Sequence, residues 1–410
     1  MTTISRRALG GVAALLPAGR AWAQARAARP VRIGVLTDMS GPYRDPTGPG
    51  SVACARQAAE EFMAANPGMP VEILSADHQN RPDVGSGIAR QWYDTDGVDM
   101  ILDVPTSSVA LAVSGATREK DKVFVNSGGA VVELTGAQCS PNTVHWTYDT
   151  WMLAKSTGAA LTKAGGDSWF FITADYAFGH ALQRDTSSFV EGAGGRVLGG
   201  VRYPFPQTTD FSSFLVQARA SRAKVLGLAN AGTDTVNCVK QAREFGLTQN
   251  TKLATLLMAI ADVHALGLET AQGLLLTESF YWDLNDRTRA FTARVRPKLP
   301  GGIPVGMIQA GCYAGAMHYL KAVAAMGVAE ARLSGRAVVE RMKAMPTDDD
   351  AFGTGSIRAD GRKIHPTYLF EVKSPREQKG PQDYYRLVGT TPAEEAFRPV
   401  SEGGCPLVRT

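Results

Sequence analysis

Short apolar runs alternate with amphipathic patterns along most of the chain. Apolar runs of about four to eight residues, bounded by turn residues, are typical of strands that are buried on both faces. Such runs predict strands at 31–36, 71–76, 100–104, 123–125, 168–173, 196–203, 224–228 and 252–257. Apolar residues at spacings of three and four predict the intervening helices, at 50–65, 84–93, 108–117, 151–163, 178–191, 211–220 and 233–245. Strands that alternate with helices indicate right-handed βαβ units on parallel sheets.

The pattern changes after the last of these strands. Helices are predicted at 288–298, 307–326 and 335–345, and the last strand-like runs lie at 366–372 and 384–388. The two earlier βα sets meet near Trp146, so the chain is predicted to be an α/β protein with two lobes of similar size. The late segments could return to either lobe. In such folds, ligands collect at the carboxyl ends of the strands, where two facing lobes form a cleft.

The first residues of the chain have the pattern of an export signal. Arg6 and Arg7 form a basic start, residues 8–16 are a short apolar stretch, and Ala21-Trp22-Ala23 is a small-x-small cleavage site. The apolar stretch is too short to span a bilayer. We therefore expect residues 1–23 to be removed and the protein to be exported. The paired arginines leave the export route open between the general and the twin-arginine pathways.

The composition is that of a folded globular protein, with 44% hydrophobic and 20% charged residues. The net charge is +4, from 43 basic and 39 acidic residues, and three of the basic ones lie in the predicted signal. The remainder is close to neutral. A neutral body gives no electrostatic reason to expect nucleic acid or an anionic membrane surface as a partner.

The five cysteines divide into two groups. Cys54, Cys238 and Cys312 lie in apolar helical patterns, where a buried free thiol is the simplest interpretation. Cys139 and Cys405 each lie close to a proline in loop-like sequence. An oxidising compartment permits disulfides. We therefore predict a Cys139–Cys405 disulfide.

The motifs of catalysis and metal binding are missing from the sequence. The six histidines are scattered without H-E-x-x-H spacing, and the chain has neither a G-x-S-x-G elbow nor a phosphate-binding P-loop. A partial G-x-G-x-x-A match at 48–53 contains Pro49 and begins too far after the first strand for a dinucleotide site. The acidic turn at 348–350 fits a solvated surface better than a cation site. These absences do not exclude an enzyme, but they leave it without a nucleophile, and they indicate no metal or cofactor site.

Two loops at strand ends carry a stronger signal. Thr106, Ser107 and Ser108 follow the 100–104 strand and begin a helix, where hydroxyls commonly cap the first turn. Hydroxyls, free N–H groups and the positive end of a helix dipole also make a site for a carboxylate. Ser127, Gly128 and Gly129 follow the 123–125 strand, and glycines let a backbone approach a ligand closely. The two loops are predicted to share an anion-binding role.

Several stretches resemble the periplasmic branched-chain amino-acid-binding proteins of ABC importers, in order and over nearly the whole mature chain. They are 31–62, PTSS at 105–108, VFVNSGGAVVELT at 123–135, ITADYAFG at 172–179, VKQAREFGL at 239–247 and FGTGSIRADGRKIHPTYLFEV at 352–372. The resemblance implies a type I periplasmic binding protein, in which three crossing segments join two Rossmann-like lobes with parallel sheets around a ligand cleft. It implies an N-terminal lobe at 30–145 plus 275–355 and a C-terminal lobe at 146–274 plus 356–410. It also implies a periplasmic protein that has no catalytic residues and binds no metal for function.

The same resemblance suggests ligand-binding residues. The family's carboxylate-binding hydroxyl loop matches residues 106–108, and its glycine loop matches 127–130, although the family's threonine there is Val131 here. The aromatic residue over the ligand matches Phe178, where a tyrosine is common. The acid that pairs with a ligand ammonium is expected at the end of the 252–257 strand. Met258 stands there instead, and Asp262 is the nearest carboxylate.

The missing acid changes the predicted ligand. An ammonium buried without an anionic partner would cost several kcal/mol, so a carboxylate with an apolar body is favoured. Tyr43, Phe178 and Met258 would line the site, whereas Tyr281 and Trp282 could equally be packing residues. The chain is thus similar to members of the family that bind aromatic acids, such as benzoate or hydroxycinnamate.

On this resemblance, the expected partners are a small-molecule carboxylate and an inner-membrane ABC permease, with the protein itself a monomer. Three alternatives stay open at this point. The ligand could be a branched-chain or other amino acid, the fold could serve a ligand sensor, or the chain could be an exported α/β enzyme whose nucleophile the motifs do not reveal.

Overall fold

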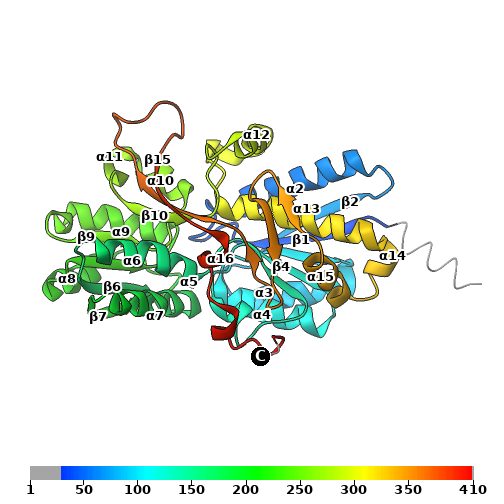
Figure 1. Cartoon of the computed structure of the whole chain (residues 1–410), viewed down its shortest axis with the longest axis horizontal. Coiled ribbons are helices and arrows are strands. Elements are labelled where there is room, and N and C mark those ends of the chain that lie inside the picture. The colour runs from blue at the N-terminus through cyan, green and yellow to red at the C-terminus, as the bar shows by residue number, and fades with distance from the viewer. Residues whose placement is uncertain (1–28, 409–410) are drawn as a thin grey trace, which may run out of the picture.

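The computed structural model describes residues 29–408. The predicted signal at 1–23 lies outside these residues. The chain folds into two α/β lobes that lie side by side, with the second lobe in green at the left of Figure 1 and the first in blue and cyan at the right. Within the described part of the chain, none of the helices combines the length and the apolar character that a membrane crossing requires.

The first lobe is built on a five-stranded parallel sheet in the order β2-β1-β3-β4-β5. Its strands are β1 (Val31–Thr37), β2 (Val71–Asp77), β3 (Met100–Asp103), β4 (Val123–Asn126) and β5 (Thr143–His145). The helices between them are α2 (Gly48–Ala65), α3 (Pro82–Gln91) and α4 (Ser107–Glu119). Both β3 and β4 are buried along their whole length, as continuous apolar runs in a covered parallel sheet should be.

The second lobe repeats this plan with a four-stranded parallel sheet in the order β7-β6-β8-β9. Its strands are β6 (Ser168–Ala174), β7 (Arg196–Tyr203), β8 (Val225–Ala229) and β9 (Lys252–Thr255). Its helices include α7 (Ala177–Gly192), α8 (Ser212–Ser221), α9 (Thr233–Glu244) and α10 (Ile260–Leu266). The helix predicted at 151–163 is present as α5 (Thr150–Leu153), a π turn at Ala154–Gly158 and α6 (Ala159–Lys163).

The late segments divide between the lobes. Helix α13 (Met307–Met326) returns to the first lobe and packs along α2, and α15 (Gly335–Lys343) contacts α13 and β4. Strands β10 (Leu275–Glu278), β14 (Thr367–Val372) and β15 (Tyr385–Thr391) form an antiparallel sheet next to β9. A small antiparallel sheet joins β11 (Thr347–Asp349), β12 (Gly353–Ile357) and β13 (Lys363–Ile364). The fold class is therefore the one the sequence predicted, whereas the lobe bounds stay a prediction.

The segments that run between the lobes meet around one backbone carbonyl. The Thr147 carbonyl after β5 accepts hydrogen bonds from His365 Nε2 at 2.8 Å and from Ser279 Oγ at 3.4 Å. The fully buried Arg362 donates to the carbonyls on either side, at Trp146 (2.8 Å) and Tyr148 (3.2 Å). The segments that follow β5, β10 and β13 are thus hydrogen-bonded to one another at one place between the lobes.

The C-terminal tail leaves the second lobe and ends on the first. After β15 it passes α16 (Ala393–Ala396), which contacts β13, and Cys405 forms a disulfide with Cys139 across 266 residues of sequence. This is the pair selected from the sequence, and Cys54, Cys238 and Cys312 are buried free thiols.

Candidate functional site: an aromatic cavity between the lobes

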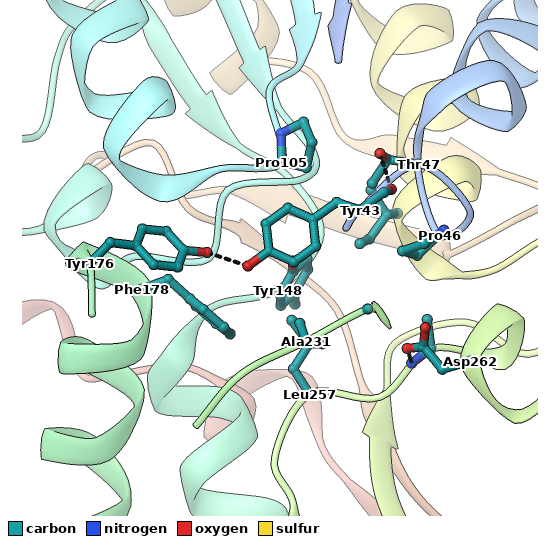
Figure 2. Close-up of a pocket in the computed structure, with 13 residues that line it drawn as sticks. Tyr43, Pro46, Thr47, Pro105, Tyr148, Tyr176, Phe178, Ala231, Leu257 and Asp262 are labelled. Atoms are coloured by element: carbon teal, nitrogen blue, oxygen red, sulfur yellow. Dashed lines mark hydrogen bonds between the residues drawn. The ribbon is translucent and has the colours of Figure 1, made fainter. Parts of the chain in front are cut away.

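The lobes face each other across a cavity at the carboxyl ends of their strands. Its walls come from both lobes (Figure 2), and they are formed by Tyr43, Pro46, Thr47, Pro105, Tyr148, Tyr176, Phe178, Ala231, Gly232, Leu257, Ala259, Asp262 and Ile308. The enclosed space is narrow, about 20 Å³, which is room for about one water molecule. The site is therefore present in a closed form, with side chains of the two lobes packed directly against one another.

The first lobe contributes Tyr43 through a loop that a buried carboxylate organises. One oxygen of Asp38 accepts from the Gly41 N–H at 2.6 Å, and the other accepts from the Tyr43 N–H and from Asn80 Nδ2, both at 2.8 Å. The Thr47 hydroxyl donates to the Tyr43 carbonyl at 2.6 Å. These bonds hold the backbone on both sides of Tyr43, and its ring lines the cavity, as the sequence predicted.

The second lobe contributes two aromatic residues at the start of α7. Tyr176 and Phe178 have ring centroids 5.9 Å apart, and the Tyr176 hydroxyl lies 2.6 Å from the Tyr43 hydroxyl of the other lobe. Burial raises the pKa of both phenols well above its usual value, so both stay neutral. Phe205 stacks on Tyr176 at 4.4 Å and on Tyr43 at 5.5 Å. A stack of rings from both lobes therefore spans the cleft.

A glycine permits a close backbone approach between the lobes. Gly232 precedes α9 with φ of 60°, in the left-handed region that favours glycine. A Cβ atom there would lie 2.2 Å from the Pro42 carbonyl and 3.0 Å from the Tyr43 ring. The same carbonyl accepts the Thr233 N–H at 3.1 Å. Closure thus brings backbone against backbone, and a side chain at 232 would prevent it.

The predicted hydroxyl loop lies beside the cavity, and only Pro105 of this loop lines it in the closed form. Thr106 and Ser107 are fully buried and Ser108 is half-buried. The Thr106 hydroxyl donates to Asn80 Oδ1, and Ser107 Oγ accepts the Ala130 N–H at 3.2 Å. Helix α4 begins without a side-chain cap, so the N–H groups of its first turn are left for another acceptor.

The predicted glycine loop does not line the cavity itself, but it is hydrogen-bonded to a tyrosine that does. Ser127 Oγ donates to the Ile308 carbonyl at 2.6 Å and lies 2.8 Å from the Thr147 hydroxyl, which attaches α13 to the crossing segment. The Gly128 carbonyl accepts the Tyr148 hydroxyl at 2.6 Å, and that tyrosine lines the cavity. Gly129 lies behind the loop against Ala110. These residues support the wall of the cavity and do not form its surface in the closed structure.

Met258 lies in the core of the second lobe and is 0% exposed, whereas its neighbours Leu257 and Ala259 line the cavity. The side chain of Met258 therefore packs into the lobe and does not line the cavity. Tyr281 and Trp282 also belong to the packing of this lobe, and the Trp282 indole N–H donates to the Gln382 carbonyl at 2.8 Å.

Asp262 is the one carboxylate among the lining residues, and the sequence could not place it. It is the third residue of α10, and its Oδ2 accepts the Ala259 N–H at 2.8 Å. Figure 2 shows its carboxyl group at the side of the cavity below Pro46. Burial raises the pKa of Asp262 to about 7. A cationic ligand nearby would lower this pKa and favour the ionised form.

The sequence analysis also missed the lining residues Tyr148 and Tyr176, although Tyr176 belongs to the ITADYAFG stretch.

The arrangement is suited to binding. Within residues 29–408, no three His, Cys, Asp or Glu side chains come together in a group that could hold a metal ion. The lining offers large apolar area from four aromatic rings, hydroxyl groups, and one carboxyl group. Such a mostly apolar cavity with a few polar groups is typical of a small-molecule binding site.

Residues 30–380 match the model of a family described as periplasmic binding protein. The chain is similar to a periplasmic binding protein from Burkholderia mallei, with 47% identity, a TM-score of 0.88, and coverage of 93% of this chain and 99% of that one. It is 38% identical to a branched-chain amino acid ABC transporter periplasmic ligand-binding protein from Burkholderia xenovorans LB400, with a TM-score of 0.78 and coverage of 92% and 99%. A solute-binding protein of an ABC transporter from R. palustris, solved with benzoate, shares the fold at 18% identity, with a TM-score of 0.76 and coverage of 89% and 97%. A comparison with curated proteins found no match.

Proposed function

The chain belongs to the periplasmic binding protein family, and on this premise we propose that it captures a small aromatic carboxylate, such as a benzoate or a hydroxycinnamate, and delivers it to an ABC permease. Its fold is that of a type I periplasmic binding protein, and it is a periplasmic solute-binding protein of the ABC-transporter type. The family consists of transport proteins that are not enzymes. The aromatic ligand, the monomeric state and delivery to a particular permease are parts of the proposal.

The observation that carries the proposal is the aromatic character of the cavity. Tyr43 and Tyr148 lie on one side of the cleft and Tyr176 and Phe178 on the other. A flat ring held between them would bury apolar surface on both faces, at about 25 cal/mol per Å², and would gain from offset ring stacking. The closed cavity is too small for such a ring, so binding requires the lobes to part at the Tyr43–Tyr176 contact and to close again over the ligand.

The carboxylate of the ligand would lie at the start of α4. The lining contains no Lys, Arg or His side chain, so the negative charge must be balanced by hydrogen-bond donors and by the helix dipole. The uncapped first turn of α4 and the hydroxyls of residues 106–108 supply such donors. N–H groups at a helix start favour an anion in this way.

A free amino acid is the second candidate, because Asp262 lines the cavity. Its carboxyl group could pair with a ligand ammonium, which would replace the acid missing at Met258. The relative from Burkholderia xenovorans, described as a branched-chain amino acid transporter component, favours this candidate. The two candidates differ in whether the ligand brings a positive charge to Asp262.

Calorimetry with matched ligands separates them. Phenylalanine and 3-phenylpropanoate share a ring and a carboxylate and differ in the ammonium, and leucine, benzoate and a hydroxycinnamate complete the set. We expect the acids without an ammonium to bind and Asp262→Asn to retain their affinity. Tight binding of leucine or phenylalanine that is lost in Asp262→Asn, with no response to the aromatic acids, would establish the amino-acid candidate instead.

A further inference from the structure

Glu278 occupies an unusual position at the end of β10, where the chain passes from the second lobe toward the first. It is 0% exposed. Its Oε1 accepts the Ile260 N–H at 3.1 Å and the Tyr385 hydroxyl at 3.2 Å, and its Oε2 accepts the Met307 N–H at 3.4 Å. None of the ion pairs found within residues 29–408 includes Glu278. The carboxyl group is therefore held by hydrogen-bond donors alone.

The two N–H groups belong to helices of different lobes. Ile260 begins α10, which packs on α9 of the second lobe, and Met307 begins α13, which packs on α2 of the first. Each is also the neighbour of a cavity residue, because Ala259 precedes Ile260 and Ile308 follows Met307. One buried carboxyl group thus touches the two helix starts that shape opposite walls of the cavity.

From this juxtaposition we propose that Glu278 is the positioning residue that couples closure of the lobes to the shape of the ligand cavity, and that closure takes up a proton at its carboxyl group. The inference rests on the proposed capture of a solute between the lobes and adds its regulation by pH. Opening of the cleft moves the start of α13 away from that of α10, which separates two of the three donors and admits water to the carboxyl group. Closure reverses both changes.

The direction of the pH effect follows from burial. Desolvation raises the pKa of Glu278 from its ordinary value to about 8 in the closed form, against the opposing effect of the three donors. A hydrated Glu278 in the open cleft is ionised at lower pH. At a pH between the Glu278 pKa of the open form and that of the closed form, the closed form holds a proton that the open form has lost. Closure therefore weakens as the pH rises through this range and becomes independent of pH above about 8. The titratable groups around Glu278 are Asp262 on α10, Tyr385 on β15 and Tyr368, its partner in register on β14.

The test follows the distance between the lobes in the ligand-free protein. Arg56 on α2 and Lys240 on α9 are exposed, and their helices begin on either side of the Pro42–Thr233 contact. Spin labels on Arg56→Cys and Lys240→Cys report the closed fraction by pulsed electron–electron resonance, since the native free thiols are buried. The open-to-closed ratio should rise by up to about tenfold per pH unit between pH 6 and 8. Glu278→Gln should remove the part of this pH dependence that Glu278 causes, and Asp262→Asn, measured in parallel, should keep that part.

Glu371→Gln is the matched control, because Glu371 lies on the neighbouring strand β14 in an exposed pair with Arg386, and it should keep the wild-type profile. If Glu278→Gln fails to fold, Tyr385→Phe tests the inference instead. Loss of the Tyr385 hydroxyl removes a donor that lowers the pKa of Glu278, so the pH dependence of closure should end at a higher pH. A closed fraction that does not change between pH 6 and 8, or a wild-type profile retained in Glu278→Gln or Tyr385→Phe, overturns the inference. The measurement needs no ligand, so a failure of the aromatic-acid proposal in calorimetry is a separate result.

Discussion

The two faces of the cleft are made of different chemistry. The lining residues of the first lobe, such as Tyr43 and Pro105, are carried by loops whose polar groups are hydrogen-bonded to one another behind the lining, as in the Asp38 loop and the Ser107–Ala130 contact. The face of the second lobe presents the rings and apolar side chains of Tyr176, Phe178 and Leu257, with Asp262 as its one carboxyl group. The first face can therefore orient a polar group of a ligand, whereas the second can cover whatever the first has bound.

This difference explains why the two faces were not equally visible in the sequence. The hydroxyl and glycine loops of the first lobe stand out because each follows a buried strand directly. In the second lobe, Phe178 was indicated only by the family resemblance, and nothing in the sequence distinguished Tyr176 until the fold placed it at the cleft. Four predictions test this division between an orienting face and a covering face, beginning with the largest expected effect.

Gly232→Ala should prevent the covering face from closing. The new Cβ would lie 2.2 Å from the Pro42 carbonyl, and overpacking together with a left-handed φ should weaken closure by about 2–4 kcal/mol. The weaker closure should appear as a lower ligand affinity in calorimetry and as a larger open fraction in the distance between spin labels at positions 56 and 240. Gly194→Ala is the control, because Gly194 has a φ of 83° and no atom within 4 Å of its added Cβ. Equal affinities of the two variants would mean that the Pro42–Gly232 contact has no part in binding.

Ser107→Ala should weaken the orienting face. Loss of a hydroxyl next to a bound carboxylate should reduce affinity by about 1–2 kcal/mol, as measured by calorimetry with the acid that binds best. Ser114→Ala removes a buried hydroxyl farther along the same helix, where it contacts Thr143 at 2.9 Å, and should change stability without changing affinity. If Ser107→Ala and Ser108→Ala both bind as the wild type does, this loop is not part of the site.

Asp262 is the one carboxyl group among the lining residues, and it should make the free energy of unfolding depend on pH. Burial raises its pKa from 3.8 to about 7, so its contribution to stability is fully present below about pH 4 and is lost as the pH rises through 7. Asp262→Asn should therefore reduce the fall in the free energy of unfolding over this range, by up to about 1.4 kcal/mol per pH unit. Urea unfolding at several pH values measures it. The exposed Asp286 serves as the control, and Asp286→Asn should leave the slope unchanged.

Tyr176→Phe should have the smallest effect, because it removes only the hydrogen bond to Tyr43 and keeps the ring. We expect closure to weaken by about 0.5–1.5 kcal/mol, visible as a larger open fraction in the label distances. Tyr93→Phe removes a buried hydroxyl bonded to Thr117 in the interior of the first lobe and should leave the distances unchanged. A closed fraction unaffected by Tyr176→Phe would show that ring packing alone holds the faces together.

The sequence predicted most of the strands of the two parallel sheets, because most of them contain a short apolar run bounded by turn residues. It missed the short strands β5, β10, β11, β12 and β13, because two to five residues are too few for a period to be seen. In the site, Tyr43 and Phe178 line the cavity as expected. Asp262 could be named as the nearest acid but not placed, since its position depends on the turn that begins α10 and on the distance between the lobes.

The disulfide has a topological consequence for an exported protein. With Cys139 joined to Cys405, the chain between them is a covalent ring of backbone that contains the whole second lobe and every segment running between the lobes. One proteolytic cut anywhere in this ring opens it without releasing a fragment. A nicked molecule would migrate as a single species on a gel until a reducing agent was added, and would then separate into two pieces.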